Sequence, residues 1–407
     1  MPQLATSRID QPAVAMLTEW IKQMEPTPLA RAEGIKLPML TPSDAGLNAA
    51  KLAEIDGLVA TAIAEKKLPG GVILIGRPTG IAWLKVFGDK RLEPNREPMT
   101  DDTVFDLASL TKPLATATSV MKLVESGKVS LDDAVAKYIP EFGVAEKQSI
   151  TLRDMLVHRS GLIPDNAIAD YADGPLPAKE RLFALKLTAP IGSKFMYSDV
   201  NFIVLGEVVS RVSGRSLNEF AQAEVFAPLG MTETSYLPAE PLRQRAAPTE
   251  QRGGKWMQGE VHDPRAFKLD GVAGHAGLFG TARDLARFAI DAMAGINDDG
   301  SRILKRATWQ RMTTRHAVVG TDKQNQETRD VRGLGWDMQS RYSINRGTKF
   351  SERAFGHGGF TGTALWIDPE RKLFVVFLSN RVHPNGKGLV NPLIGQISEI
   401  AVEAIQP

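Results

Sequence analysis

The sequence predicts a mixed α/β (α+β) fold, in which an antiparallel sheet built from both ends of the chain is interrupted by a mainly helical region. Short apolar runs typical of strands occupy residues 71–76 and 81–88 near the start of the chain. Similar runs occupy residues 363–367 and 373–379 near its end, and the turn residues 368–372 join this second pair as a hairpin. Strands joined by short turns are antiparallel, so both ends of the chain are expected to contribute to one antiparallel sheet.

Helices are expected to flank this sheet at both ends of the chain. Residues 49–66 have the apolar periodicity of an amphipathic helix, and a second helix is expected over residues 389–405. A further strand is expected at residues 333–338. Residues 1–44 precede these elements and are interpreted as an N-terminal extension, in which residues 17–22 form a short packed helix or part of a mobile arm.

The middle of the chain is predicted to be mainly helical. Three of its segments begin with a serine or threonine that is followed three residues later by an acid, which is the capping pattern of a helix start. We therefore divide the chain into a sheet region of residues 45–105 plus 295–407 and an inserted helical region of residues 106–294. Pockets favour such junctions, so the active site is expected in the cleft between the two regions. The capping pairs are Thr151 with Asp154, Ser216 with Glu219, and Thr281 with Asp284.

The composition is that of a globular enzyme and excludes several classes of function. The chain has 49 lysines and arginines and 47 aspartates and glutamates, so its net charge is +2. This charge is too small and too dispersed for nucleic-acid binding. The chain has no cysteine, which excludes a disulfide scaffold. We recognise no transmembrane segment and no signal peptide, and the localisation stays open.

Ser109 and Lys112 form the first candidate catalytic pair. They stand three residues apart where an apolar helical stretch begins, so both side chains lie on one face of its first turn. A serine hydroxyl is a poor nucleophile until a neighbouring base takes its proton, and a lysine amine at this spacing can do so. Taken alone, the pair is equally well explained by a helix N-cap serine and a surface lysine.

The chain contains the same spacing a second time, at Ser119 and Lys122. Ten helical residues separate the two serines, which is about 15 Å of rise and a different direction on the helix, so both cannot face one cleft. Ser119 stands in the middle of the helix, where a hydroxyl usually bonds to a carbonyl one turn earlier. We therefore interpret Ser119 as structural.

Two later segments carry further candidate residues. A tyrosine-serine-aspartate run at 197–199 stands where a loop meets an apolar helical stretch that ends at Gly214. A histidine-glycine-glycine run at 357–359 leads into the strand predicted at 363–367. Glycines at the start of a strand indicate a close approach of the backbone to a ligand or to another segment.

In this order, the serine-x-x-lysine, the tyrosine-x-acid turn and the basic residue before a glycine strand form a three-part signature. On these motifs the chain resembles the superfamily of serine β-lactamases, penicillin-binding proteins and family VIII carboxylesterases, and it is most similar to the class C β-lactamase branch. Segments 151–162 and 271–281 support the resemblance, which covers the chain from about residue 45 to its end. The resemblance implies a β-lactamase/transpeptidase-like fold.

The resemblance also implies a mechanism. Ser109 would attack a carbonyl and become acylated, while Lys112 and Tyr197 share the general-base and general-acid work. The phenolic oxygen near the lysine is expected to have a lowered proton affinity. The backbone N–H groups of Ser109 and Phe360 would form the oxyanion hole, and water would then release the acyl group.

Two departures from the class C pattern bear on the substrate. Asp199 stands where class C β-lactamases have an asparagine, and a carboxylate accepts hydrogen bonds but cannot donate them. It can hold Lys112, yet it would bind the amide side chain of a β-lactam poorly. His357, Gly358 and Gly359 replace a lysine-threonine-glycine strand, which removes a permanent cation and a hydroxyl. His357 would contribute hydrogen bonding and, when protonated, positive charge for a substrate carboxylate.

Three functional hypotheses follow. The favoured one is an acyl-enzyme serine hydrolase that acts on an ester or a small amide. Among such hydrolases, a family VIII-like esterase is favoured. The second is a true class C-type β-lactamase or a D-amino-acid peptidase with the same mechanism. The third is a non-catalytic penicillin-binding sensor or scaffold. The expected partner is a small-molecule acyl substrate, namely an ester, a β-lactam or a D-amino-acid peptide.

Other chemistries find less support in the sequence. None of the six histidines belongs to a His-Glu-x-x-His metal pair, so no metal site is expected. His262 and Asp263 are interpreted as a turn, and His158 and His275 as hydrogen-bonded loop or core residues. No Gly-x-Ser-x-Gly elbow, phosphate-binding loop or complete dinucleotide motif occurs, and no cofactor is expected.

Overall fold

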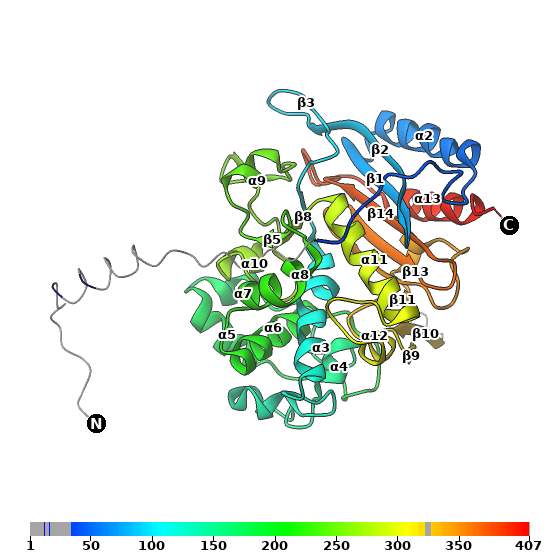
Figure 1. The fold of residues 1–407 in the computed structure, drawn as a ribbon. Helices are drawn as coiled ribbons and strands as arrows, with labels where there is room; N and C mark the ends of the chain where they lie inside the picture. The colour runs from blue at the N-terminus through cyan, green and yellow to red at the C-terminus, as the bar shows by residue number, and fades with distance from the viewer. Residues whose placement is uncertain (1–11, 13–15, 17–33, 322–326, 407) are drawn as a thin grey trace.

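The largest sheet of the protein has nine antiparallel strands and lies in the right-hand half of the molecule in Figure 1. The computed structural model describes residues 34–321 and 327–406, together with residues 12 and 16. The strand order is β3-β2-β1-β14-β13-β12-β11-β10-β9. These strands are β1 (Gly70–Arg77), β2 (Gly80–Arg91), β3 (Glu97–Pro98), β9 (His316–Thr321), β10 (Glu327–Arg332), β11 (Asp337–Gln339), β12 (Phe355–Gly359), β13 (Thr363–Asp368) and β14 (Leu373–Ser379).

The two ends of the chain meet in the middle of this sheet, which confirms the predicted fold class. β1 pairs with β2 on one side and with β14 on the other, with Gly71 opposite Ser379. A bridge between Leu47 and Ile405 joins the terminal segments again outside the sheet. The predicted terminal helices are α2 (Ala49–Ala64) and α13 (Asn391–Glu403), and they contact each other.

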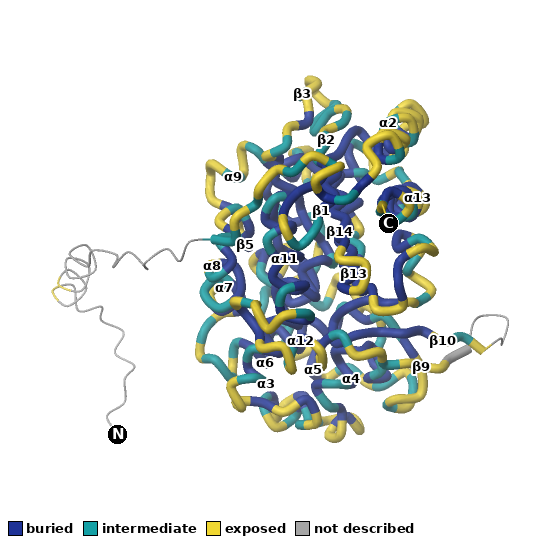
Figure 2. The backbone as a smooth tube through the Cα atoms, turned by 45° about the vertical axis from the view of Figure 1, so that its right-hand side comes forward, coloured by how far each residue is buried: buried dark blue, intermediate teal, exposed yellow. Residues whose placement is uncertain are grey.

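Both faces of the sheet are covered, which explains why β1 is apolar without alternation. Val72 and Leu74 belong to the hydrophobic core that also contains α11 (Ala282–Asp298). Ile73 and Ile75 point to the other face and belong to the core formed with α2 and α13. Figure 2 shows these strands as buried, whereas α2 exposes its outer side.

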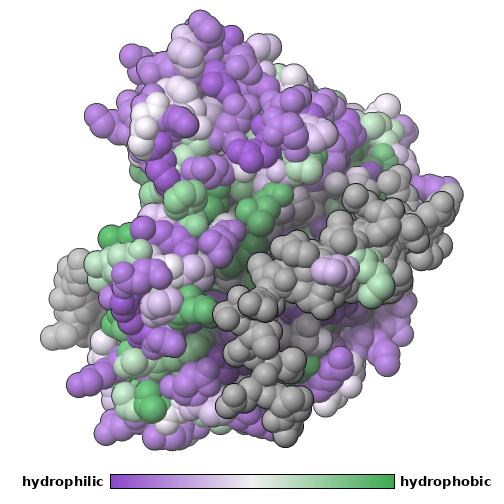
Figure 3. All heavy atoms as spheres, turned by 90° about the vertical axis from the view of Figure 1, so that its left-hand side faces the viewer, coloured by the Kyte–Doolittle hydropathy of each residue, from purple (hydrophilic) through white to green (hydrophobic). Residues whose placement is uncertain are grey.

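Helices and short strands make up most of the chain between β2 and α11. A three-stranded sheet in the order β4-β8-β5 lies within this region, and β6 and β7 form a separate pair. Figure 3 shows one face of the molecule, on which hydrophobic side chains gather near the middle between more hydrophilic areas above and below. The strands are β4 (Phe105–Asp106), β5 (Ser235–Tyr236), β6 (Gln251–Arg252), β7 (Lys255–Trp256) and β8 (Leu278–Gly280).

The predicted helix starts at Thr151 and Ser216 are complete capping boxes, and Thr281 accepts from the N–H of Asp284. The remaining helices are α3 (Thr118–Glu125), α4 (Leu152–Leu156), α5 (Pro175–Phe183), α6 (Asp199–Ser213), α7 (Leu217–Ala221), α8 (Ala227–Leu229), α9 (Glu240–Arg245), α10 (Pro264–Lys268) and α12 (Arg306–Met312). None of the helices in the described part of the chain combines the length and the apolar character needed to span a bilayer.

The structure corrects one predicted strand and adds several that were not predicted, among them β9 and β10. Most of residues 333–338 form a turn, in which the N–H of Gly333 donates to the carbonyl of Trp336, and β11 begins only at Asp337. The hairpin of β9 and β10 was not predicted, because β10 is rich in charged residues and its sequence has no apolar alternation.

Part of the N-terminal extension is attached to the fold. The N–H of Ile35 donates to the carbonyl of Leu229 at 3.0 Å, and Met39 forms a bridge with Ile81. The helix or arm expected at residues 17–22 lies outside the described residues.

Candidate active site

Ser109 lies on a short 3-10 helix, Ala108–Leu110, that directly follows β4. Ala108 has a φ of +46°, a left-handed conformation that costs a residue with a side chain about 1–2 kcal/mol. The buried carboxylate of Asp106 stabilises this turn, because it accepts from the N–H of Ala108 at 2.8 Å and from the N–H of His262 at 2.7 Å. The strained turn leaves Ser109 partly exposed, three residues before the π-helix Lys112–Ala117 begins.

Lys112 is fully buried beside Ser109, and each of its polar contacts is short. Its Nζ lies 3.0 Å from Oγ of Ser109, 3.1 Å from the carbonyl oxygen of His275 and 2.6 Å from Oδ1 of Asp199. Burial alone would lower the pKa of Lys112, but the charge of Asp199, with a contribution from Tyr197, outweighs it and raises the pKa. Lys112 is therefore an ammonium ion at neutral pH.

Tyr197 completes the cluster: Nζ of Lys112 lies 4.9 Å from the centre of its ring, and its hydroxyl interacts with both Lys112 and Ser109. Burial raises the pKa of Tyr197, and the charge of Lys112 lowers it by less. Asp199 adds to the increase. The lowered proton affinity expected from the sequence is therefore wrong, because burial and a nearby carboxylate outweigh the lysine.

Local structure fixes the position of Tyr197 and Asp199. Ser198 is the N-cap of α6 and accepts from the N–H of Asn201, so Asp199 is the first residue of this helix. The ring of His158 stacks on the ring of Tyr197 with 4.5 Å between centroids. Nδ1 of His158 accepts from the N–H of Ser198 at 3.0 Å, which joins the stacked ring to the cap.

Strand β12 brings the third motif against the turn that carries Ser109. A Cβ on Gly359 would lie 2.2 Å from Oγ1 of Thr363 and 2.5 Å from the carbonyl oxygen of Leu107. This contact requires glycine, as the sequence pattern indicated. The strand and the 3-10 helix that carries Ser109 are in contact, and a Cβ on Gly359 would lie 3.3 Å from Cβ of Ala108.

His357 is buried and neutral. Its Nδ1–H donates to the carbonyl of Gly358 at 2.8 Å. Burial, together with the charges of Arg332 and Lys112, holds the pKa of His357 well below its usual range. The expectation that His357 supplies positive charge when protonated is therefore wrong in this environment, and its remaining role is as a hydrogen-bonding group.

A cavity of about 300 Å³ opens beside these residues. Its lining includes Tyr197, His357, Gly358, Gly359 and Phe360. Ser109 and Lys112 are not part of this lining, but both interact with Tyr197, which does line the cavity. The structure thus brings together all the residues that the three motifs identified.

The cavity also contains charged residues that the sequence analysis missed. Arg332, at the end of β10, is buried and lies 3.2 Å from Asp337. Arg381, just after β14, also lines the cavity. Arg381 follows a strand that the sequence predicted, and this position is the signal that could have identified it, whereas Arg332 ends β10, which has no periodic signal.

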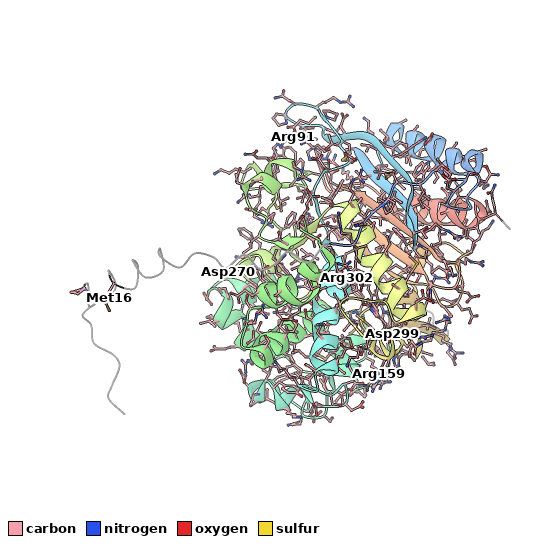
Figure 4. All side chains as sticks on the ribbon, viewed as in Figure 1. Met16, Arg91, Arg159, Asp270, Asp299 and Arg302 are labelled. Atoms are coloured by element: carbon pink, nitrogen blue, oxygen red, sulfur yellow. The ribbon has the colours of Figure 1, made fainter. Side chains whose placement is uncertain are left out.

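A second cavity of about 450 Å³ lies elsewhere, and its lining contains none of the predicted site residues. Asp270, which follows α10, belongs to that lining and is labelled in Figure 4.

Asp199, Asp263 and His275 form a cluster whose possible ligand atoms lie within 4.8 Å of one another. In this cluster Asp199 is paired with Lys112, and Asp263 lies 2.9 Å from Nε2 of His275. Asp263 also accepts from two N–H groups as the N-cap of α10, so the turn predicted at 262–263 is a helix start. These contacts give the carboxylates protein partners next to the nucleophile.

Ser119 is fully buried in α3, in agreement with a structural role. Its hydroxyl, however, has no hydrogen-bond partner among the described residues, so the expected bond to a carbonyl one turn earlier is not formed.

Comparisons with known proteins agree with this fold and site. A 390-residue alignment gives 30% identity to the "Putative D-alanyl-D-alanine carboxypeptidase" of Escherichia coli (strain K12), covering 86% of this chain and 87% of the relative. The N-acetylmuramyl-L-alanine amidase of Bacillus subtilis (strain 168) is 31% identical over 370 residues, which cover 82% and 81% of the two chains.

Two solved structures are similar as well. The hydrolase EstCE1, described as having promiscuous acyltransferase activity, has a TM-score of 0.67 and 25% identity, and the match covers 87% of this chain and 99% of that one. A class C β-lactamase has a TM-score of 0.68 at 17% identity, covering 89% and 99%, and this likeness shows the fold alone. The family model described as Beta-lactamase matches residues 55–396. The chain therefore belongs to the beta-lactamase family, whose members are serine hydrolases.

Proposed function

We propose that the protein hydrolyses an ester or a small amide through an acyl-enzyme on Ser109. The observation that carries this proposal is the cluster of Ser109, Lys112 and Tyr197 beside an open cavity, in which Lys112 is hydrogen-bonded to Ser109. A nucleophile needs a base within hydrogen-bond reach, and Nζ of Lys112 lies 3.0 Å from Oγ of Ser109.

In the proposed reaction, Oγ of Ser109 attacks the carbonyl carbon and its proton passes to the Lys112–Tyr197 pair. The N–H groups of Ser109 and Phe360 stabilise the oxyanion. The pair then protonates the leaving alcohol or amine, and water attacks the acyl-enzyme with the same pair as base. Because Lys112 and Tyr197 both carry their protons at neutral pH, one proton must leave before the pair can act as a base.

The preference for an ester or small amide over a β-lactam rests on Asp199 and His357. Asp199 offers acceptors only, so it cannot donate to the amide carbonyl of a β-lactam side chain. His357 is neutral and brings no cation to the third motif. A family VIII-like esterase fits these properties. A D-amino-acid peptidase is the second candidate, because one relative of 30% identity has the name "Putative D-alanyl-D-alanine carboxypeptidase".

Steady-state hydrolysis of nitrocefin, p-nitrophenyl acetate and p-nitrophenyl butyrate tests the proposal, with Ser109→Ala as the background. We expect a higher kcat/KM for the two esters and slow or stalled turnover of nitrocefin. Efficient turnover of nitrocefin would contradict the preference and favour a β-lactamase. No hydrolysis of any of the three substrates would favour the peptidase.

A further inference from the structure

Asp106, the last residue of β4, is hydrogen-bonded to three separate segments around the proposed oxyanion hole. Its Oδ1 accepts from the N–H of Ala108 at 2.8 Å, and its Oδ2 accepts from the N–H of His262 at 2.7 Å. Its backbone carbonyl accepts from Oγ1 of Thr361 at 2.7 Å. Asp106 is 3% exposed and Thr361 is 1% exposed, so these bonds are shielded from water.

Two of these bonds fix residues that are adjacent to the proposed oxyanion-hole donors. Ala108 directly precedes Ser109, and Thr361 directly follows Phe360. Asp106 therefore holds the backbone beside both donors at once, one through its carboxylate and the other through its carbonyl.

Two further contacts hold the same segments together. Oγ1 of Thr363, on β13, donates to the carbonyl of Leu107 at 3.1 Å. The ring of His262, whose N–H is bonded to the Asp106 carboxylate, stacks on the ring of Phe360 with 5.5 Å between centroids. The segment that carries Phe360 is thus tied to β4 through its backbone and through its ring.

An oxyanion hole stabilises charge only when its donors converge on the position that the oxyanion will occupy. The two proposed donors belong to distant parts of the chain, because 255 residues separate Asp106 from Thr361. No single helix or strand sets the distance between the donors. Contacts between the two segments must set it, and Asp106 makes the shortest of the contacts described above that join their backbones.

We infer that Asp106 is a positioning residue that aligns the two oxyanion-hole donors with each other. The inference rests on the proposed function, because the two N–H groups stabilise an oxyanion only if acyl transfer takes place. A carboxylate suits this position, since both of its oxygens accept and it can hold two N–H groups. An asparagine has one oxygen and one NH₂ group, so one of the two N–H groups would face another donor.

Two substrates that differ in a single atom test the inference, namely p-nitrophenyl butyrate and its thiono analogue, in which sulfur replaces the carbonyl oxygen. Sulfur is a weaker hydrogen-bond acceptor than oxygen, so the thiono ester depends less on the oxyanion hole. The readout is the ratio of kcat/KM for the oxo ester to kcat/KM for the thiono ester. A variant that is partly unfolded loses both activities equally and keeps this ratio.

We expect the ratio to fall about 10- to 100-fold in Asp106→Asn, because removal of a whole donor costs about 100- to 1,000-fold and here a donor is only displaced. Thr361→Val, which loses the hydroxyl, should lower the ratio too, whereas Thr361→Ser should keep it. The matched control is Asp291→Asn. Asp291 is a buried carboxylate on α11 that accepts from the N–H of Arg302 at 2.7 Å and does not line the cavity, so this variant should lose stability and keep the ratio.

A wild-type ratio in Asp106→Asn and in Thr361→Val would overturn the inference and leave the proposed hydrolysis intact. If Asp106→Asn does not fold, the Thr361 variants decide the test, because they leave the carboxylate and its two N–H bonds in place. A wild type that hydrolyses neither ester would overturn the hydrolysis proposal itself, and the inference with it.

Discussion

Replacing Asp199 by asparagine removes the carboxylate that holds Lys112 in its charged form. Oδ1 of Asp199 lies 2.6 Å from Nζ of Lys112, which is fully buried. Asp199 raises the pKa of Lys112 against the effect of burial. In Asp199→Asn burial is no longer opposed by this charge, so the pKa of Lys112 should fall. A general base is inactive while it is protonated, so kcat/KM rises as the pH passes the pKa of the base. A lower pKa of Lys112 therefore moves this rise to lower pH.

The expected displacement is about two pH units or more. At an effective dielectric constant of about 20, two unit charges about 4 Å apart interact by about 4 kcal/mol. A pKa unit corresponds to about 1.4 kcal/mol, so loss of this interaction is equivalent to roughly three units. The assay is the pH dependence of kcat/KM for p-nitrophenyl butyrate between about pH 5 and pH 10. The wild-type rate should still be rising at the alkaline end.

An Asp199→Asn enzyme that remains active with the rising limb at the wild-type pH would refute the reasoning. In that case the group that titrates in the free enzyme would not be Lys112. Asp132→Asn is the matched control, because Asp132 forms an exposed ion pair with Arg153 and should leave the profile unchanged.

Two further predictions concern the third motif. Gly359→Ala places a Cβ within 2.5 Å of Thr363 and Leu107, so urea unfolding should show that the free energy of unfolding falls by about 1–3 kcal/mol. In the control Gly57→Ala, which lies in open space on α2, the free energy of unfolding should rise by about 0.5–1 kcal/mol. A Gly359→Ala variant that unfolds at the same urea concentration as the wild type would contradict the close approach of Gly359 to Thr363 and Leu107. The low pKa of His357 predicts that nitrogen NMR shows a neutral ring with Nδ1 protonated at pH 5.5. An imidazolium signal at that pH would contradict the assigned environment.

The sheet and the site motifs could be predicted because their signals are local. Apolar runs such as residues 71–76 and 373–379 identify central strands, whose two faces are both covered. The serine and lysine three residues apart, and the glycine of β12, follow from the geometry of one helical turn and of one close backbone contact. Capping at Thr151 is equally local.

The remaining features depend on contacts between distant segments. Strand β10 is rich in charged residues, so its pairing with β9 has no periodic signal. Burial and the charge of Asp199 raise the pKa of Tyr197. The residues next to Tyr197 in the sequence do not show how deeply its hydroxyl is buried. Arg381 reaches the site only because β14 lies in the same sheet as β12.

The measurement that tests the central claim most directly is the mapping of the acyl-enzyme. Acid quenching during turnover of p-nitrophenyl butyrate, followed by mass spectrometry of the intact protein and its peptides, locates the acyl group. We predict a butyryl group on Ser109 in the wild type and in Ser119→Ala, and no such adduct in Ser109→Ala. Ser119→Ala should be harmless, because its hydroxyl makes no hydrogen bond among the described residues. An adduct on Ser119, or one that persists in Ser109→Ala, would contradict the placement of the nucleophile.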